Sequence, residues 1–414
     1  MTDRGGVVAE HPGVRYGRRP RVLVLARSYP NTAIPLLGLW TRGLVHCAAA
    51  GAEVKVVSPV PYVPPLPARG PLEYYALQRR VPARSWDGNV ETLHPRMLVG
   101  PGYTTRPLEA ATYAAAAFPA ARRLRATFPF DVIHAHFGYP DGVVAVALGR
   151  RHRVPVVISE HVPWLDWMRS PGTARRQTLW AARNCAALVP VSRYVGATIA
   201  EVLGDERSMA EPVTPAVDGS VFGPAPAGAR RPDQVLFAGA VRHVKGVDVL
   251  VEALARLRRR RPGVRLVLAG DPFFRTYRRD AEAVLERARA LGVRDCIDVV
   301  GGQPPEALAR LMGESAVLVV PSRAESFSAV CIEALACGTP VVATRCGGPE
   351  EIVTPALGRL VRIEDPADLA DGLAAVLDDP GRYDPLALRR DALDRYGTDV
   401  VQRRLAALYD TVLS

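Results

Sequence analysis

The stretch at residues 321–353, PSRAESFSAVCIEALACGTPVVATRCGGPEEIV, decides how this chain folds and where its chemistry lies. It follows an apolar run that predicts a buried strand, and it places Glu325 and Glu333 eight residues apart. Residues 329–336 predict a helix, with Ser328 at the N-cap position. We therefore expect Glu325 in the loop before the helix and Glu333 about one turn inside it.

This arrangement suits a ligand that carries both phosphate and hydroxyl groups. The start of a helix leaves backbone N–H groups without partners, and the helix dipole favours an anion there. Carboxylates at two depths, those of Glu325 and Glu333, can accept hydrogen bonds from sugar hydroxyls. The structural alternative is a pair of surface carboxylates beside arginines.

Strand-like runs alternate with helical periodicity on both sides of this stretch. The alternation predicts βαβ units and parallel sheets, so the fold class is α/β. Two such series indicate two facing, Rossmann-like, doubly wound domains, with ligands in the cleft beyond the carboxyl ends of the strands. The expected strands are residues 21–26, 53–58, 131–136, 155–160, 187–192, 234–238, 265–269, 297–300, 317–320, 340–343 and 359–361.

Composition sets the expected domain boundaries. Glycine and proline gather between the two series, which predicts an interdomain linker. The irregular region 60–105 contains a hairpin signal at Asp87-Gly88. The expected divisions are a flexible tail at 1–20, a first domain at 21–205, a linker at 206–233, a second domain at 234–398, and a helix at 399–414 that can return to the first domain.

Charge and cysteine usage limit the possible partners and the compartment. Residues 1–200 carry 25 Arg and Lys against 11 Asp and Glu, whereas residues 201–414 carry 28 against 31. The basic half fits contact with an anionic surface such as the inner face of a membrane, or a solvated surface rich in arginine. The six cysteines form no C-x-x-C pair, and the chain has neither an apolar start segment nor an apolar run of ~18 residues. These features favour a cytoplasmic protein.

Several site classes lose support from missing motifs. No G-x-G-x-x-G follows a strand and no P-loop sequence occurs, which disfavours dinucleotide and P-loop nucleotide sites. His134 and His136 share one strand face, but no third ligand stands at a zinc spacing, so no metal is expected.

The stretch at residues 321–353 resembles the two-glutamate motif of the retaining glycosyltransferases of family 4 (group 1), which have the GT-B fold. The resemblance covers roughly residues 21–410 and is strongest over 235–375. It implies that Glu325 contacts the donor sugar and that Glu333 binds the ribose hydroxyls. It further implies that sugar and diphosphate are held by the amides of Phe327, Ser328, Ala329 and Val330.

A second element, GAVRHVKGV at residues 239–247, also resembles the family. Members usually grip the donor diphosphate here with an arginine and a lysine, and the resemblance implies that Gly239, just before them, also binds the donor. Lys245 matches, and it is one of only two lysines in the chain. The arginine position holds Ala240, so Arg242 is the candidate replacement. Two cations on the diphosphate would do the work of a divalent metal, which implies metal-independent catalysis.

The first domain contributes histidines to the expected cleft. Resemblance to the family implies that His136 touches the donor sugar, whereas His134 fits a packed core position. His161, after the next strand, is a second cleft candidate.

The resemblance implies transfer of a hexosyl-type sugar from a nucleotide sugar, with UDP as the commonest family base. The donor is a co-substrate, so no cofactor is expected, and no nucleic acid partner is indicated. Two N-terminal stretches resemble transferases of exopolysaccharides and cell-envelope glycans, namely RSYPNTAIPLLGLW at residues 27–40 and HAHFGYPDG at 134–142. This resemblance suggests a glycan or lipid-linked acceptor. It also suggests a peripheral place at the inner membrane face. The alternatives are a secondary-metabolite (small-molecule) acceptor, a nucleotide-sugar epimerase on the same fold, and a non-catalytic nucleotide-sugar-binding protein.

Overall fold

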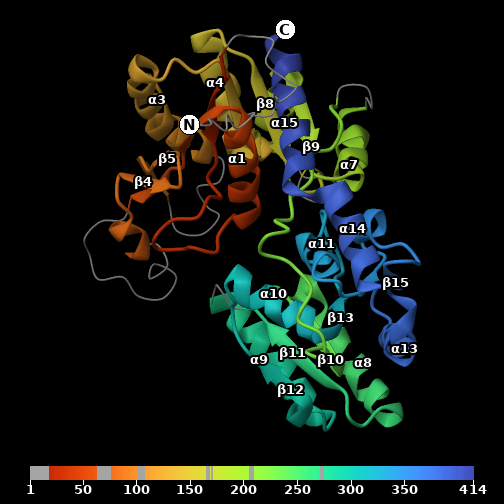
Figure 1. The fold of residues 1–414 in the computed structure, drawn as a ribbon. Helices are drawn as coiled ribbons and strands as arrows, with labels where there is room; N and C mark the ends of the chain where they lie inside the picture. Colours follow the sequence, from red (N-terminus) through yellow and green to blue (C-terminus); the bar gives the residue numbers. More distant parts are fainter. Residues whose placement is uncertain are drawn as a thin grey trace, which may run out of the picture.

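The computed structural model describes residues 18–62, 76–99, 108–164, 168, 171–204, 209–270 and 275–414. The described chain forms two α/β domains, each with one main sheet between layers of helices (Figure 1). This architecture confirms the expected pair of Rossmann-like domains.

The N-terminal domain is built on a seven-stranded sheet in the order β4-β5-β2-β1-β7-β8-β9. All neighbouring pairs are parallel except β4 and β5, which form the hairpin that Asp87-Gly88 predicted. The strands are β1 (Arg21–Leu25), β2 (Glu53–Val57), β4 (Arg84–Asp87), β5 (Val90–Leu93), β7 (Val132–His136), β8 (Val156–Glu160) and β9 (Ala187–Pro190). The helices are α1 (Leu39–Gly51), α3 (Glu109–Thr127), α4 (Val143–His152), α6 (Thr173–Asn184) and α7 (Arg193–Leu203).

The C-terminal domain holds a six-stranded, fully parallel sheet in the order β12-β11-β10-β13-β14-β15. Its strands are β10 (Arg231–Ala238), β11 (Arg265–Ala269), β12 (Ile297–Val299), β13 (Ser315–Val320), β14 (Val341–Thr344) and β15 (Gly358–Val361). Its helices are α8 (Val247–Arg260), α9 (Arg275–Ala290), α10 (Pro305–Glu314), α11 (Ala329–Ala336), α12 (Pro349–Ile352), α13 (Pro366–Asp378) and α14 (Pro385–Tyr396).

Each sheet has a point where the strand order reverses. In the N-terminal domain this point lies between β1 and β7, and in the C-terminal domain between β10 and β13. Ligands of doubly wound sheets bind beyond the carboxyl ends of the strands at such points. The loops after these four strands are therefore where a site should form.

The last helix, α15 (Thr398–Leu413), runs from the C-terminal domain to the N-terminal domain and lies beside α1 (Figure 1). Val401, Leu405 and Tyr409 recur every four residues, and all three are buried against the N-terminal sheet. At the turn before this helix, Val217 donates its N–H to the carbonyl of Tyr396, so two chain segments cross between the domains side by side.

Two short strands were not expected from the sequence. β3 (Val60–Tyr62) and β6 (Arg96–Leu98) form a separate parallel pair inside the region read as irregular. Prolines at positions 61 and 95 obscure their strand pattern, and each strand prolongs the path of a longer one, β2 or β5. Among the helices that the structure describes, none is long and apolar enough to cross a membrane.

Candidate active site

The loops after β10 and β13 meet at the reversal point of the C-terminal sheet and bring two predicted residues together. Lys245 Nζ lies 2.6 Å from Glu325 Oε1, and Ser322 Oγ donates to the same carboxylate oxygen at 2.8 Å. The Glu325 side chain is 11% exposed and that of Lys245 is 28% exposed, so both keep one face open. A cation and an anion thus stand together at the strand ends.

Gly246 fixes the place of this lysine. Its φ of 64° is left-handed, and a Cβ there would lie 2.0 Å from the carbonyl oxygen of Pro321. Only glycine allows the loop after β10 to press so closely against the loop after β13. The contact explains why Lys245 reaches a residue 80 positions away.

The start of α11 matches the expected boundaries but differs at its first residue. Ser328 has a φ of 82°, and its side chain does not cap the helix; instead its Oγ lies 3.3 Å from Cys331 Sγ. Side-chain capping requires an extended backbone, which Ser328 lacks, so the expected cap is wrong. Within the described residues, the N–H groups of 327–330 have no hydrogen-bond acceptor. They remain available to an anion.

Two residues hold this helix start in place. The Phe327 ring packs edge-on against Tyr396, with ring centroids 5.4 Å apart. A Cβ on Gly348 would lie 2.3 Å from Phe327 Cα, so the loop of Gly347 and Gly348 rests directly on the backbone there. Ala329 and Val330 begin the helix and are half-buried.

Glu333 lies one turn inside α11 and is half-buried. Burial raises the pKa of its carboxyl group to about 7, and no charged partner offsets this effect. Within the described residues its carboxylate has no ion-pair or hydrogen-bond partner. A ligand with hydroxyl donors would satisfy it.

The other two predicted donor residues lie at the start of the loop after β10. Gly239 has a φ of 146°, and its N–H donates to the carbonyl of Ala269 at 2.9 Å, so that group is already used. Arg242 is exposed and precedes the short helix at His243–Lys245. Its carbonyl accepts from Lys245 N at 2.8 Å, which tightens this turn.

Three histidines stack at the carboxyl end of the N-terminal sheet. His134 and His136 lie 4.7 Å apart, and His136 and His161 lie 5.2 Å apart, measured between ring centroids. His134 contacts Tyr409 Oη at 2.7 Å and Ser159 Oγ at 2.8 Å, which confirms the packed core position. Burial lowers the pKa of all three rings, and that of His161 falls to about 4, so they are neutral near pH 7.

His136 Nδ1 lies 3.0 Å from His161 Nε2, and its ring is only 1% exposed, whereas His161 is 7% exposed. Glu160 beside them accepts hydrogen bonds from the N–H groups of Gly138 and His161 and from the Trp164 indole. This buried carboxylate orders the loop after β7 and leaves the neighbouring His161 nearest the surface.

Sequence reasoning missed the contacts that join the domains beside this site. Ser192 Oγ donates to the carbonyl of Ser326 at 2.6 Å, and Glu351 accepts from the N–H groups of Arg193 and Tyr194. The acidic run PEE at residues 349–351 was the only sequence feature that pointed to a contact here, and it does not indicate which residues Glu351 binds. Within the described residues, no three metal-binding side chains gather in one place.

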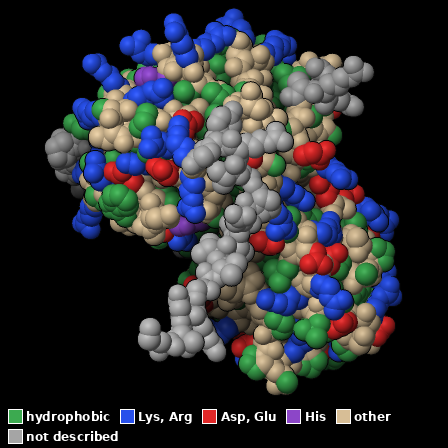
Figure 2. All heavy atoms as spheres, turned by 45° about the horizontal axis from the view of Figure 1, so that its top comes forward, with side chains coloured by type: hydrophobic (Ala, Val, Ile, Leu, Met, Phe, Trp, Pro, Cys, Tyr) green, Lys and Arg blue, Asp and Glu red, His purple; other side chains and the backbone are tan. Residues whose placement is uncertain are grey.

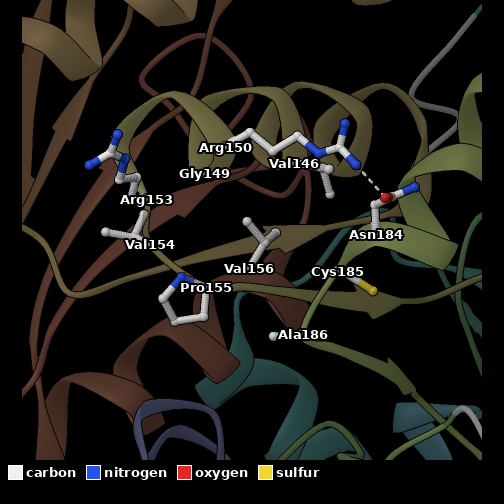
Figure 3. Close-up of a pocket in the computed structure, with 10 residues that line it drawn as sticks. All are labelled: Val146, Gly149, Arg150, Arg153, Val154, Pro155, Val156, Asn184, Cys185 and Ala186. Atoms are coloured by element: carbon white, nitrogen blue, oxygen red, sulfur yellow. Dashed lines mark hydrogen bonds between the residues drawn. The ribbon is translucent and has the colours of Figure 1, made fainter.

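A separate hollow of about 330 Å³ lies at the opposite edge of the N-terminal sheet (Figure 3). Arg150 and Arg153 stand at its two ends, over a floor that includes Val154, Pro155 and Val156. Arg150 donates to the side chain of Asn184, and no carboxylate lines the hollow. It lies at the amino ends of β8 and β9, away from the loops of the candidate site.

Two family models match the chain. The model "Glycosyltransferase Family 4" matches residues 44–219, and "Glycosyl transferases group 1" matches residues 226–397. The curated relatives include the D-inositol 3-phosphate glycosyltransferase of Nocardia farcinica, 32% identical over 63% of this chain and 61% of that relative. The enzyme of the same name from Acidothermus cellulolyticus is 32% identical over 75% of this chain and 79% of that relative.

Solved structures share the fold at lower identity. Sucrose-phosphate synthase from Thermosynechococcus elongatus superposes with a TM-score of 0.74 at 21% identity, over 95% of this chain and 99% of that one. Anabaena HepE in complex with UDP-glucose gives a TM-score of 0.72 at 18% identity, over 94% and 99%. Both confirm the GT-B fold. The chain belongs to the group 1 (family 4) glycosyltransferases, the class of enzymes that moves a sugar from a nucleotide-sugar donor.

Proposed function

We propose that this enzyme transfers a hexosyl-type sugar from a UDP-sugar to an acceptor hydroxyl, with retention of the anomeric configuration. The observation that carries the proposal is the pairing of Lys245 with Glu325 beside the open N–H groups at the start of α11. A cation and helix N–H groups suit a diphosphate, and a carboxylate suits a sugar hydroxyl.

Each residue has a role in this proposal. Lys245, Arg242 and the N–H groups of residues 327–330 hold the diphosphate and balance the charge that develops on the departing nucleotide. Glu325 accepts hydrogen bonds from the sugar, and Glu333 accepts them from the ribose. His136 approaches the sugar from the N-terminal domain, ordered by its contact with His161.

The reaction needs no covalent intermediate in this proposal. The acceptor oxygen attacks the anomeric carbon on the face that the nucleotide leaves, and the bond from that carbon to the phosphate oxygen breaks. The acceptor proton passes to a donor phosphate oxygen, which becomes part of the released nucleotide. The protein supplies orientation and electrostatic stabilisation.

The rival activities make different demands on the site. An epimerase would act on the donor alone, so a requirement for an acceptor separates it from a transferase. A non-catalytic binding protein would tolerate loss of charged site residues. The retained pair of Lys245 and Glu325, together with the unpartnered Glu333, supports a working donor site. The loss of arginine at Ala240 is the one feature of the site that favours the non-catalytic reading.

Two acceptor classes have support. The N-terminal sequence resembles transferases of cell-envelope and exopolysaccharide glycans, which suggests a glycan or lipid-linked acceptor. The relatives carry the name of a small phosphorylated polyol, D-inositol 3-phosphate. A secondary metabolite is the remaining alternative. We favour a cell-envelope glycan acceptor, and a transfer assay with D-inositol 3-phosphate in parallel with membrane extract separates the first two.

We also propose a peripheral contact with an anionic membrane, through the basic edge of the N-terminal domain. This edge comprises the exposed arginines at the amino ends of the parallel strands: Arg18, Arg19, Arg122, Arg123, Arg150, Arg151, Arg153 and Arg183. Figure 2 shows arginine side chains gathered over the top of this domain. The edge lies opposite the cleft, so docking there would leave the active site open.

The proposed donor site is tested by calorimetric titration of the protein with UDP and with GDP, in EDTA at pH 8. That pH keeps Glu333 ionised, because its pKa lies near 7. We expect micromolar affinity for UDP without metal, and a loss of at least tenfold in Glu333→Ala, because a half-buried carboxylate that accepts two ribose hydroxyls is removed.

Each other outcome has a definite meaning. Tight binding of GDP in place of UDP would change the donor base and keep the site. Binding that is unchanged in Glu333→Ala would remove the ribose from that residue. Failure of both nucleotides to bind would contradict the proposed function.

A further inference from the structure

The carboxylate of Glu351 bridges the two domains beside the proposed donor site. Glu351 lies in α12 of the C-terminal domain, and its two oxygens accept hydrogen bonds from the N-terminal domain. Oε1 accepts from Tyr194 N at 2.7 Å, and Oε2 accepts from Arg193 N at 3.0 Å. Because these residues begin α7, the carboxylate takes N–H groups that the helix leaves unpaired.

A second contact crosses between the domains at the same place. Ser192, the N-cap of α7, donates its hydroxyl proton to the carbonyl of Ser326, and its Oγ accepts from Val195 N. Ser326 directly precedes the open N–H groups that begin at residue 327. A Cβ on Gly347 would lie 2.5 Å from the ring of Tyr194, so the domains touch without a gap there.

The contact of Glu351 with α7 is linked to the backbone of Glu325 through two hydrogen bonds and a short stretch of chain. Gly348 N donates to the Glu325 carbonyl at 2.9 Å, and Glu325 N donates to the Cys346 carbonyl at 3.0 Å. Glu351 follows Gly348 by three residues. Glu351 therefore connects α7 to the isolated β-bridge between Glu325 and Gly347.

We propose that Glu351 is a positioning residue for transfer, which sets the N-terminal domain in register with the donor site of the C-terminal domain. The inference rests on the proposed function, in which Glu325 holds the donor sugar. Lys245, Glu325 and Glu333 all belong to the C-terminal domain. Loss of the Glu351 contact should therefore slow transfer while leaving nucleotide affinity almost unchanged, because only the approach of the other domain is disturbed.

One backbone substitution removes half of this contact without touching Glu351. Arg193→Pro deletes the N–H that Oε2 accepts, yet proline is favoured at the first position of a helix. Ser192 before it has φ −157° and ψ 162°, an extended backbone that tolerates a following proline. Arg193→Ala is the matched control, because it removes the same side chain and keeps the N–H.

A pair of isosteric variants, each of which removes one negative charge, tests the carboxylate itself. In Glu351→Gln one carboxylate oxygen is replaced by an NH2 group, which is itself a donor and faces the backbone N–H of either Arg193 or Tyr194. One of the two hydrogen bonds is therefore replaced by a repulsion between two donors. Glu350→Gln is its control: Glu350 is exposed, and its contacts, Gly347 N at 3.2 Å and Arg345, lie within its own domain.

Three quantities are measured. The first is the rate of UDP release from UDP-glucose, UDP-galactose and UDP-N-acetylglucosamine, with D-inositol 3-phosphate or water as acceptor. The others are the Kd for UDP and the radius of gyration from small-angle scattering with UDP bound. We expect kcat in Arg193→Pro at least fivefold below that of Arg193→Ala, and kcat in Glu351→Gln at least tenfold below that of Glu350→Gln. The Kd for UDP should stay within threefold, and both test variants should have larger radii than their controls.

Equal radii of gyration in the test variants and their controls would overturn the proposal, whatever the turnover. Loss of UDP binding in Glu351→Gln would also overturn it, because the residue would then act within the C-terminal domain alone. Failure of the proposed function has a different signature, namely absence of both UDP and GDP binding in the wild-type protein.

Discussion

Lys245 and Glu325 come from loops 80 residues apart, and their side chains form an ion pair. The lysine is held by Gly246 against the Pro321 carbonyl, and the carboxylate is held by Ser322 and by the backbone of the neighbouring loop. Arg323 does structural work beside them, since it pairs with Asp248 and Glu364. Lys245 and Glu325 are thus the residues proposed to face the ligand, whereas Gly246, Ser322 and Arg323 hold the loops.

Removing either member of the pair should abolish most turnover. We expect Lys245→Ala and Glu325→Ala each to lose roughly a hundredfold or more in kcat, equivalent to ~2–4 kcal/mol for one charged contact. Turnover is measured as UDP release, and urea unfolding checks the fold. The control is Arg265→Ala, which breaks a surface pair with Asp298 and should keep full activity. Wild-type turnover in both site variants would refute the assignment.

At the scale of elements, close approach of loops positions the site. The loops after β10 and β13 meet at Gly246, the helix start at α11 meets the loop of Gly347 and Gly348, and α7 meets α12 across the domains. Each of these contacts requires either a glycine, which leaves room for the neighbouring backbone, or a hydrogen bond from a backbone N–H group at the end of a helix. The strands fix where these loops begin, and the loop contacts fix which groups face the cleft.

Gly246→Ala should separate the lysine from its partner. An alanine must keep a left-handed φ of 64° and place Cβ 2.0 Å from the Pro321 carbonyl oxygen, so the loop has to shift. We expect at least a tenfold loss of turnover and a loss of stability above ~1 kcal/mol.

Gly292→Ala provides the matched control for this prediction. Its φ of 69° is also left-handed, but no neighbour lies within 4 Å of the added Cβ. It should lose only the ~1 kcal/mol of the backbone conformation and keep full turnover. Similar activity losses in both variants would show that backbone conformation, and not the contact with Pro321, is responsible.

At the scale of the whole molecule, charge is distributed by position in the fold. Many arginines of the C-terminal domain form ion pairs, such as Arg260 with Asp371 and Arg287 with Glu252. At the basic edge of the N-terminal domain, Arg18 pairs with Asp131. Within the part of the chain that the structure describes, no ion pair involves Arg122, Arg123, Arg150, Arg151, Arg153 or Arg183. On the face drawn in Figure 2, blue side chains predominate at the top of the N-terminal domain, whereas red and blue side chains are mixed over the C-terminal domain.

Removing four of these charges should weaken binding to anionic vesicles. Sedimentation with phosphatidylglycerol vesicles, against phosphatidylcholine vesicles, measures the effect at low and high salt. At about 1 kcal/mol per arginine, the quadruple Gln variant of Arg122, Arg123, Arg150 and Arg151 should bind roughly a thousandfold less. The equivalent variant of Arg260, Arg265, Arg287 and Arg289, each ion-paired, should bind like wild type. Equal binding to both vesicle types would contradict a membrane contact.

The sequence by itself determined the fold class and the helices and strands that carry the candidate site, because both depend on local pattern. Apolar runs and helical periodicity predicted strands such as β13 and helices such as α11, whose bounds at 329–336 match. The motif residues Glu325, Glu333 and Lys245 were named because their stretches resemble the family motifs, and their roles toward a donor stay a prediction.

Only the tertiary structure decided how these pieces face one another. The left-handed backbone of Ser328 leaves the helix start uncapped, and this conformation depends on the loop packed against it. His134 meets Tyr409 from the other end of the chain, and Glu351 meets α7 across 157 and 158 residues. Such contacts carry no local pattern, because their energy arises only when distant segments have already been brought together by the two sheets.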